Sequence, residues 1–255
     1  MISVIVCSID DRKFAAVDAT YRRLLGAGAG AGGEAYEIIR IADARSMCEG
    51  YNRGFSQSRG DVLIFSHDDI EIHAADFRAR LLRHLDRCDV AGVAGTPLLC
   101  GPAWAWAGPP FLYGQLGQYH RAQNHFEAAI FATPARHVGN MQALDGVFLA
   151  CHRRVVEATP FDEQTFTGFH HYDLDFCYRA CGGGFKLAVC CDLDLIHFSD
   201  GTWDDAWKAS AARFMAKYAG KLPVRQRPNW NRMSVRVATR EELLPRFRWP
   251  HWETE

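Results

Sequence analysis

Two adjacent carboxylates, Asp68 and Asp69, follow an apolar run at residues 62–65, and His67 stands directly before them. A short apolar run with two β-branched residues is typical of a buried strand in a parallel sheet. Ligands of open α/β sheets bind beyond the carboxyl ends of the strands, so this is where a metal ion or a phosphate is expected. A polar turn is the alternative, because Asp and His are common turn residues.

A second acidic group, Asp173 and Asp175, lies in a segment that predicts a helix from about Tyr172. In such a helix Asp175 pairs with Arg179 four residues later and is structural. Asp173 faces inward near the helix N-terminus. It is either a catalytic carboxylate or only a first-turn acid that stabilises the helix dipole.

His197 ends another short apolar run. Taken alone, it is more often a hydrogen-bonded core histidine than a ligand. A metal hydrolase is one class that such residues could serve, and its candidates would be His170, His171, Asp173, Asp175 and His197. The spacing lacks H-E-x-x-H or a comparable helical pair, which disfavours that class.

Strand-like and helix-like segments alternate along the first hundred residues. Strands are expected at 2–7, 36–41 and 61–66, and helices at 12–25 and 46–58. This alternation predicts an α/β fold with a Rossmann-like, mixed but mostly parallel central sheet flanked by helices. No G-x-G-x-x-G follows the first strand, which disfavours NAD or FAD.

Composition narrows the class of protein. The formal net charge of -1 gives no global attraction to nucleic acid, and no apolar run approaches the ~20 residues that a membrane span requires. The nine cysteines include no C-x-x-C pair, so a disulfide framework or a thiolate zinc site is disfavoured. A reducing cytoplasm is the expected location.

Two regions fall outside the alternation. Residues 96–139 are rich in Pro and aromatic residues and predict a long functional loop, whose aromatic faces suit either sugar stacking or packing under a lid. Residues 221–255 form a basic extension containing Trp230, Trp249 and Trp252. Peripheral contact with a membrane is one reading of this extension, and packing on the domain is the favoured one.

Several motifs then occur in a recognisable order. They are the Cys7-Ser8-Ile9-Asp10 loop, Asp43, Tyr51-Asn52-Arg53-Gly54-Phe55, His67-Asp68-Asp69, Phe161-Asp162-Glu163, His171-Tyr172-Asp173-Leu174-Asp175 and Leu195-Ile196-His197. In this order the chain resembles the family 2-like GT-A glycosyltransferases over residues 2–218. It departs from their pattern twice, because His67 replaces the first acid of the D-x-D motif and Tyr172 replaces the Glu before the catalytic acid.

The resemblance implies a role for each motif. It implies one GT-A domain at 1–220, with a nucleotide-binding half at 1–95, the aromatic region at 96–139 and an acceptor and catalytic half at 140–220. Asp173 is implied as the catalytic base, and Asp69 and His197 as the metal ligands. The implied nucleotide residues are Cys7, Ser8, Asp10, Asp43, Asn52, His67 and Asp68, and the implied sugar and acceptor residues are Asp145, Gly146, His171 and Tyr172.

The implied function is an inverting hexosyl- or N-acetylhexosaminyltransferase. It would use Mn²⁺ (or Mg²⁺) and a UDP-sugar, and would extend a glycan or a lipid-linked saccharide in bacterial surface polysaccharide synthesis at the cytoplasmic face of the membrane. One oxygen and one imidazole ligand suit Mn²⁺ better than Mg²⁺. The alternative is a GT-A module that binds sugar nucleotides without turnover, which the unusual His67 and Tyr172 suggest.

Overall fold

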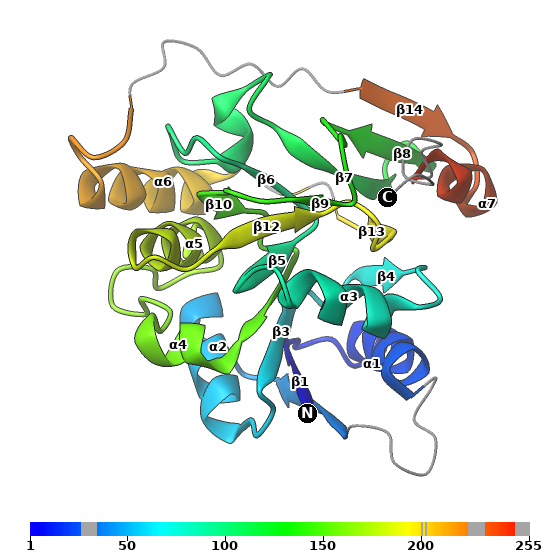
Figure 1. Ribbon diagram of the computed structural model, residues 1–255, viewed down its shortest axis with the longest axis horizontal. Coiled ribbons are helices and arrows are strands. Elements are labelled where there is room, and N and C mark those ends of the chain that lie inside the picture. The colour runs from blue at the N-terminus through cyan, green and yellow to red at the C-terminus, as the bar shows by residue number, and fades with distance from the viewer. Residues whose placement is uncertain (27–34, 200, 202, 224–232, 248–255) are drawn as a thin grey trace.

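A computed structural model describes residues 1–26, 35–199, 201, 203–223 and 233–247, and it contains two β-sheets (Figure 1). The first sheet has the order β2-β1-β3-β11-β5-β12-β9. Its strands are β2 (Tyr36–Ile41), β1 (Ile2–Cys7), β3 (Val62–Ser66), β11 (Phe148–His152), β5 (Val90–Gly92), β12 (Leu187–Cys190) and β9 (His137–Val138). Only β11 and β9 run against the other strands, so the predicted mixed, mostly parallel sheet is confirmed.

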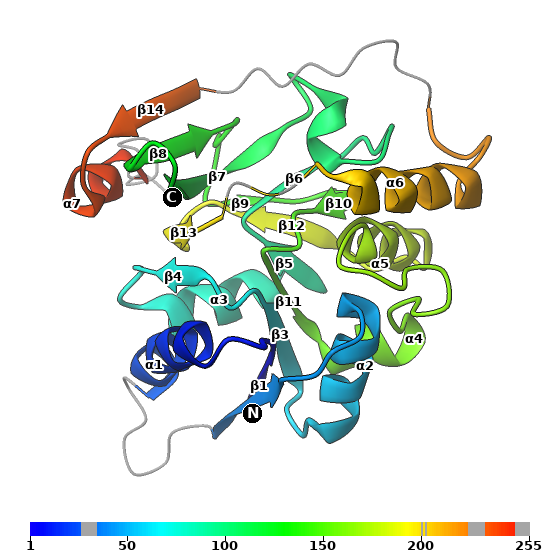
Figure 2. The same ribbon diagram turned by 180° about the vertical axis from the view of Figure 1, so that it is seen from behind.

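Helices cover both faces of this sheet (Figures 1 and 2). In β3, Val62 and Ile64 pack toward α1 (Asp11–Gly26) and α3 (Phe77–Leu85). Leu63 and Phe65 point the other way. They pack with residues of α2 (Met47–Gln57), α4 (Arg153–Ala158) and α5 (Tyr172–Gly182). Successive side chains of a strand point to opposite faces, so a continuous apolar run predicts a sheet buried on both sides.

The second sheet corrects the prediction of a long loop at 96–139. It has the order β10-β6-β7-β13-β4, and β8 and β14 extend it from β7. Its strands are β10 (Ala143–Leu144), β6 (Ala94–Thr96), β7 (Tyr113–His120), β13 (Leu195–His197), β4 (Ile70–Ile72), β8 (His125–Ile130) and β14 (Met233–Val237). The β7–β8 hairpin has glycines and few β-branched residues, so its strands give a weak sequence signal. The short helix η1 (Trp104–Ala107) precedes the hairpin.

Two of the points at which the chain passes from one sheet to the other are neighbours in space. Val93 separates β5 from β6, and residues 145–147 separate β10 from β11. The amide of Asp145 donates to the carbonyl of Ala94 at 2.9 Å, which ties the two crossings together. Asp145 is therefore held where the sheets meet.

Part of the basic extension packs on the second sheet. The strand β14 pairs with β8, and α7 (Arg240–Leu243) and η2 (Leu244–Phe247) follow. Leu243 and Phe247 are buried against Ala128, Ile130 and Ile196. Trp230, Trp249 and Trp252, on which the membrane reading rested, lie outside the described residues.

The remaining helix, α6 (Asp205–Lys217), packs Phe214 and the following Tyr218 into the core beside α5. Within the described residues, no helix combines the length and the hydropathy needed to cross a bilayer.

Candidate active site

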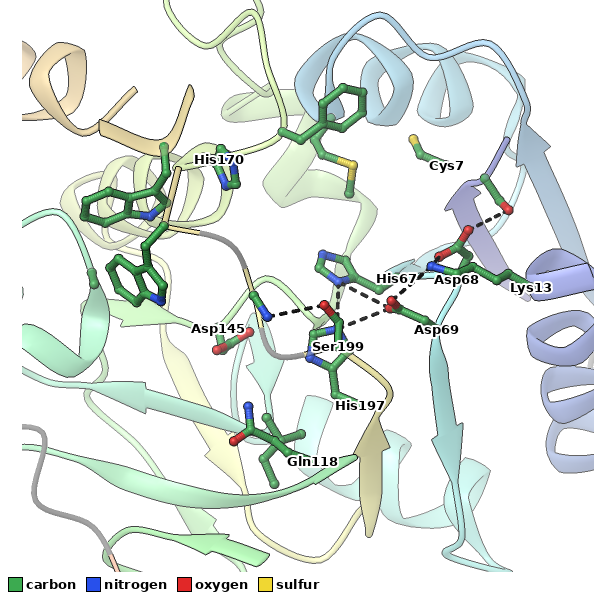
Figure 3. A pocket seen from close by; sticks show the side chains of 18 of the residues that line it. Cys7, Lys13, His67, Asp68, Asp69, Gln118, Asp145, His170, His197 and Ser199 are labelled. Carbon is green, nitrogen blue, oxygen red and sulfur yellow. Dashed lines mark hydrogen bonds and ion pairs between the residues drawn. The ribbon is translucent and has the colours of Figure 1, made fainter. Parts of the chain in front are cut away.

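A cleft of about 1480 Å³ opens at the carboxyl ends of the parallel strands (Figure 3). Cys7 and Ser8 follow β1, Asp43 follows β2, and the His67-Asp68-Asp69 triplet follows β3. Pockets for single drug-sized ligands usually measure about 300–1,000 Å³, so this cleft has room for more than one small molecule.

Three metal-ligating side chains converge inside the cleft. His67, Asp69 and His197 bring one ligand atom each within 4.8 Å of one another. The Nε2 atom of His197 lies 3.2 Å from Asp69 Oδ1 and 3.4 Å from His67 Nδ1, although 130 residues separate the two histidines. The strand β13 brings His197 here by pairing with β4, which follows the triplet directly.

The protonation states of this group suit a divalent cation. Burial would raise the pKa of Asp69, but the hydrogen bond from His197 and the nearby positive charges hold it well below its usual range. Burial also lowers the pKa of His67 to about 4, and the adjacent His197 adds to the effect. An ionised carboxylate and a neutral imidazole are the forms that bind metal, so the donor set fits a divalent ion.

Tyr172 determines which ring nitrogen of His67 is free to face Asp69 and His197. The hydroxyl of Tyr172 donates to the carbonyl of Gly146 at 3.0 Å and lies 2.8 Å from His67 Nε2. Because that hydroxyl proton is used, the hydroxyl accepts from His67, and the proton of His67 is on Nε2. Its Nδ1 lone pair therefore points toward His197 and Asp69.

A lysine that sequence reasoning missed lies beside the carboxylates. The Nζ atom of Lys13, in the first turn of α1, is 3.3 Å from Asp69 and 3.7 Å from Asp68. Asp68 also accepts from the hydroxyl of Ser8 at 2.7 Å. The only sequence signal for Lys13 is its position, because the first turn of a helix after a parallel strand faces the ligand edge of the sheet.

Asp173 lines a smaller recess of about 170 Å³ beside the cleft, and His67, Trp104 and Asp145 border both spaces. The Oδ2 atom of Asp173 accepts from the amide of Gly146 at 2.9 Å. Burial and the charge of Asp145 raise the pKa of Asp173 to about 7. A carboxylate with such a pKa can accept a proton near neutral pH.

Aromatic side chains form much of the remaining cleft wall. They are Trp104, Trp106, Phe131, Phe169, Trp203 and Trp207. The indole of Trp104 donates to Asp145 at 2.8 Å, while Phe169 and Trp203 are 54% and 51% exposed. In Figure 3, Asp145 and His170 lie across the cleft from Lys13. Aromatic side chains and carboxylates therefore line the same cleft.

Two residues predicted to bind the nucleotide have structural positions instead. Asp10 is exposed, and its carboxylate accepts from the amides of Arg12 and Lys13 at the start of α1. The side chain of Asn52 donates to the carbonyl of Phe161 and accepts from its amide. Neither residue lines the cleft, and both side chains already bond to backbone groups.

The other predicted residues divide between the two spaces. Cys7, Ser8, Asp43, His67 and Asp68 line the cleft. Gly146, His171 and Tyr172 line the recess, and Asp145, like His67, lines both. Burial, followed by the charge of Glu49, raises the pKa of Cys7 to about 12, so its thiol is neutral and is no nucleophile.

The side chains proposed for a metal hydrolase do not form one ligand group within the described residues. Asp175 is buried and bonded to Arg179, Lys217 and Tyr218, as the structural reading of this residue predicts. His171 Nδ1 is 2.9 Å from the hydroxyl of Ser210.

The profile of a family described as "Glycosyltransferase like family" matches residues 3–219. No curated protein matches the chain.

One solved structure has a similar fold. The mannosyltransferase PcManGT from Pyrobaculum calidifontis, in complex with GDP-Man and Mn2+, superposes with a TM-score of 0.53 at 13% identity, over 87% of this chain and 65% of the mannosyltransferase. A197 from STIV superposes with a TM-score of 0.44 at 11% identity, over 78% of this chain and 86% of that protein. The superposition with the mannosyltransferase agrees with the GT-A fold expected from the sequence.

Proposed function

Because the chain belongs to the glycosyltransferase-like family and has a GT-A-type fold, we propose that it transfers a sugar from a nucleoside-diphosphate donor to a saccharide acceptor. The observation that carries this proposal is the convergence of His67, Asp69 and His197 at the carboxyl ends of the strands. A donor diphosphate accumulates negative charge as it leaves, and this group lies where that charge would develop.

His67, Asp69 and His197 would hold a divalent cation, Mn²⁺ in preference to Mg²⁺, because two imidazoles accompany one carboxylate. When bound, such an ion supplies Lewis-acid stabilisation of the leaving diphosphate. Lys13 adds a fixed positive charge 3.3 Å from Asp69, within reach of the same phosphate oxygens. The Mn2+ named with the mannosyltransferase gives independent support for a cation in this fold.

The nucleoside would lie over the ends of β1 and β2. Asp43 is 81% exposed at its side chain and pairs with Arg53 at 2.7 Å, so its carboxylate is held beside the cleft. The hydroxyl of Ser8 donates to Asp68, which would face the ribose. We propose UDP as the nucleotide, and GDP is its main competitor because the mannosyltransferase carries GDP-Man.

Asp173 would act as the general base that removes the proton of the acceptor hydroxyl. Its raised pKa supports this role, and a placed carboxylate contributes ~10²–10⁴-fold. Direct attack opposite the leaving group inverts the anomeric carbon. Asp145, Gly146, His171 and Tyr172 would shape the sugar and acceptor pocket next to it.

The acceptor would be a glycan or a lipid-linked saccharide of a bacterial surface polysaccharide, and the transferred group a hexosyl or N-acetylhexosaminyl unit. The aromatic wall supports a saccharide acceptor, since the faces of aromatic rings pack against the apolar faces of sugars. The reaction would take place in the cytoplasm, at the inner face of the membrane when the acceptor is lipid-linked.

A sugar-nucleotide-binding module without turnover is the second candidate. One observation favours it: the Gly146 amide donates to Asp173 Oδ2, and Asp173 lies in the recess beside the cleft. In that case the carboxylate only fixes the turn at Gly146. Binding would then persist without transfer.

Thermal unfolding with a panel of UDP-, GDP-, dTDP- and CMP-linked sugars, with and without Mn²⁺, tests the proposal. The expected result is a rise in the unfolding midpoint with one class of donor, dependent on Mn²⁺ and lost in Asp69→Ala. Release of free nucleotide on adding acceptors then separates a transferase from a binding module. No stabilisation by any donor would refute both candidates.

A further inference from the structure

A second group of metal-ligating side chains lies on the face of the first sheet that α3 covers. His84, His137 and Cys190 bring two imidazole nitrogens and a sulfur within 4.8 Å of one another. None of the three lines the cleft or the recess. They come from α3, β9 and β12, and the proposed function does not use them.

Strand pairing places two of these residues together. His137 and Cys190 are register partners in the antiparallel pair β9–β12, so their side chains leave the same face of the sheet. His84 reaches them from the last turn of α3. Its ring stacks on that of His137 with centroids 5.4 Å apart and an interplanar angle of 13°, and the two Nδ1 atoms are 3.1 Å apart.

A buried carboxylate orients His84. The Nε2 atom of His84 lies 2.7 Å from Asp192 Oδ1, and both side chains are less than 10% exposed. A carboxylate accepts, so His84 Nε2 carries the proton, and its Nδ1 lone pair is left to face Nδ1 of His137. Metal-ligating histidines commonly donate their other ring N–H to a carboxylate in this way.

We propose that His84, His137 and Cys190 bind a Zn²⁺ ion that fastens the edge strand β9 to β12 and α3. Zinc favours tetrahedral sites of nitrogen and sulfur, and two nitrogens at about 2.0–2.1 Å from such an ion lie at a separation close to the one found here. Binding releases the thiol proton of Cys190, and the resulting thiolate together with Asp192 balances the two charges of the ion. Three protein ligands leave a fourth position for water, and half-buried His137 lies on the open side.

The absence of C-x-x-C pairs does not argue against this site. In the sequence, His84, His137 and Cys190 are each 53 residues from the next, so no local spacing reveals the group. Only the pairing of β9 with β12 and the packing of α3 bring them together.

Cobalt is the probe that tests the site, because a thiolate bound to Co²⁺ gives a sulfur-to-metal absorption in the near ultraviolet. The cleft group of His67, Asp69 and His197 contains no sulfur. The full chain, stripped with a chelator and titrated with Co²⁺, is expected to show this absorption at one equivalent. Zn²⁺ should then displace the cobalt and raise the unfolding midpoint.

Matched variants assign the signal to a residue. Cys190→Ser should abolish the absorption, while Cys88→Ser, a buried neighbour outside the group, and Cys7→Ser, in the cleft, should keep it. His137→Asn, at the half-buried edge, should weaken Co²⁺ binding tenfold or more, and it serves as the test if Cys190→Ser does not fold. Asp69→Ala should keep the signal, which separates this site from the one in the proposed function.

The proposal is overturned if the native chain shows no sulfur-to-cobalt absorption. It is overturned equally if that absorption survives Cys190→Ser or disappears in Cys7→Ser. None of these results would refute the transferase proposal, since its metal group of His67, Asp69 and His197 contains no sulfur.

Discussion

The Nε2 atom of His67 lies 2.8 Å from the hydroxyl of Tyr172, and these are the two residues at which the sequence is expected to depart from the glycosyltransferase pattern. The two positions are therefore in direct contact. An acid in the usual motif needs no partner to present an oxygen, whereas an imidazole must be held in one tautomer. Tyr172 meets that need because its own proton is donated to Gly146.

Tyr172→Phe is expected to weaken Mn²⁺ binding by about 10–100-fold, the usual effect of losing a residue that orients a metal ligand. Without the hydroxyl, the ring of His67 can carry its proton on either nitrogen. Calorimetric titration of the variant with Mn²⁺ measures the change. Tyr218→Phe is the matched control, because it removes a buried hydroxyl that bonds to Asp175 away from the cleft. Equal Mn²⁺ affinity in native protein and Tyr172→Phe would show that Tyr172 does not orient His67.

Asp173→Asn is expected to lower the transfer rate ~10²–10⁴-fold while leaving donor binding near its native value, because only the base is lost. Exposed Asp205→Asn is the control and should transfer sugar at the native rate. Rapid transfer by Asp173→Asn would show that Asp173 is not the general base. It would favour a structural role, in which the carboxylate only stabilises the turn.

The pH profile gives a second measure of the same residue. Burial and Asp145 raise the pKa of Asp173 to about 7, so the base is ionised only above that pH. The value of kcat/KM should therefore fall as the pH drops below about 7. Asp145→Asn should move this fall to lower pH, whatever its effect on the maximum rate. A profile that is flat from pH 5 to pH 8, on the order of three units across the pKa, would contradict the assignment.

The raised pKa of Asp173 also makes the free energy of unfolding depend on pH. A carboxyl whose pKa is higher in the folded than in the unfolded chain favours folding at low pH, and this contribution is lost as the pH rises from about 4 through about 7. Asp173→Asn lacks the ionisable group. Its free energy of unfolding relative to the native protein should therefore increase over that interval, as urea unfolding at several pH values would show.

Lys13→Ala is expected to change nucleotide and metal binding in opposite directions. The lysine partly neutralises Asp68 and Asp69, so its loss should tighten Mn²⁺ binding in the absence of nucleotide. It also removes a charged hydrogen-bond donor, which should weaken binding of a nucleoside diphosphate about tenfold. Arg12→Ala removes a charge from the same turn outside the cleft and serves as control. If both variants change Mn²⁺ and nucleotide binding equally, Lys13 acts only through its general positive charge.

Phe247→Ala is expected to cost about 3–5 kcal/mol in the free energy of unfolding, because its ring is buried beneath the second sheet. Gln115 also donates to the carbonyl of Phe247 at 2.9 Å, so the C-terminal segment is tied to β7. Exposed Arg246→Ala in the same turn is the control. Urea unfolding measures both variants, and a native-like midpoint for Phe247→Ala would mean that residues 233–247 do not support the domain.

What the amino-acid sequence determined by itself is local and periodic. The apolar run of β3 predicted a sheet buried on both faces, and the polar triplet after it predicted the ligand edge. The i,i+4 pair of Asp175 and Arg179 was also predictable, because helical spacing alone makes these side chains neighbours.

Tertiary structure decided which polar groups remain available to a ligand. Asp10 and Asn52 have suitable chemistry, but neighbouring backbone groups use their polar atoms. His67, which was predicted to bind the nucleotide, lies beside His197 and Tyr172 because β13 and α5 bring these residues to it from distant parts of the chain. The β7–β8 hairpin was missed for a related reason, since its stability comes from pairing with neighbouring strands and little from its own residues. Hydrogen-bond partners and strand neighbours are set by long-range packing, so residue type and spacing cannot specify them.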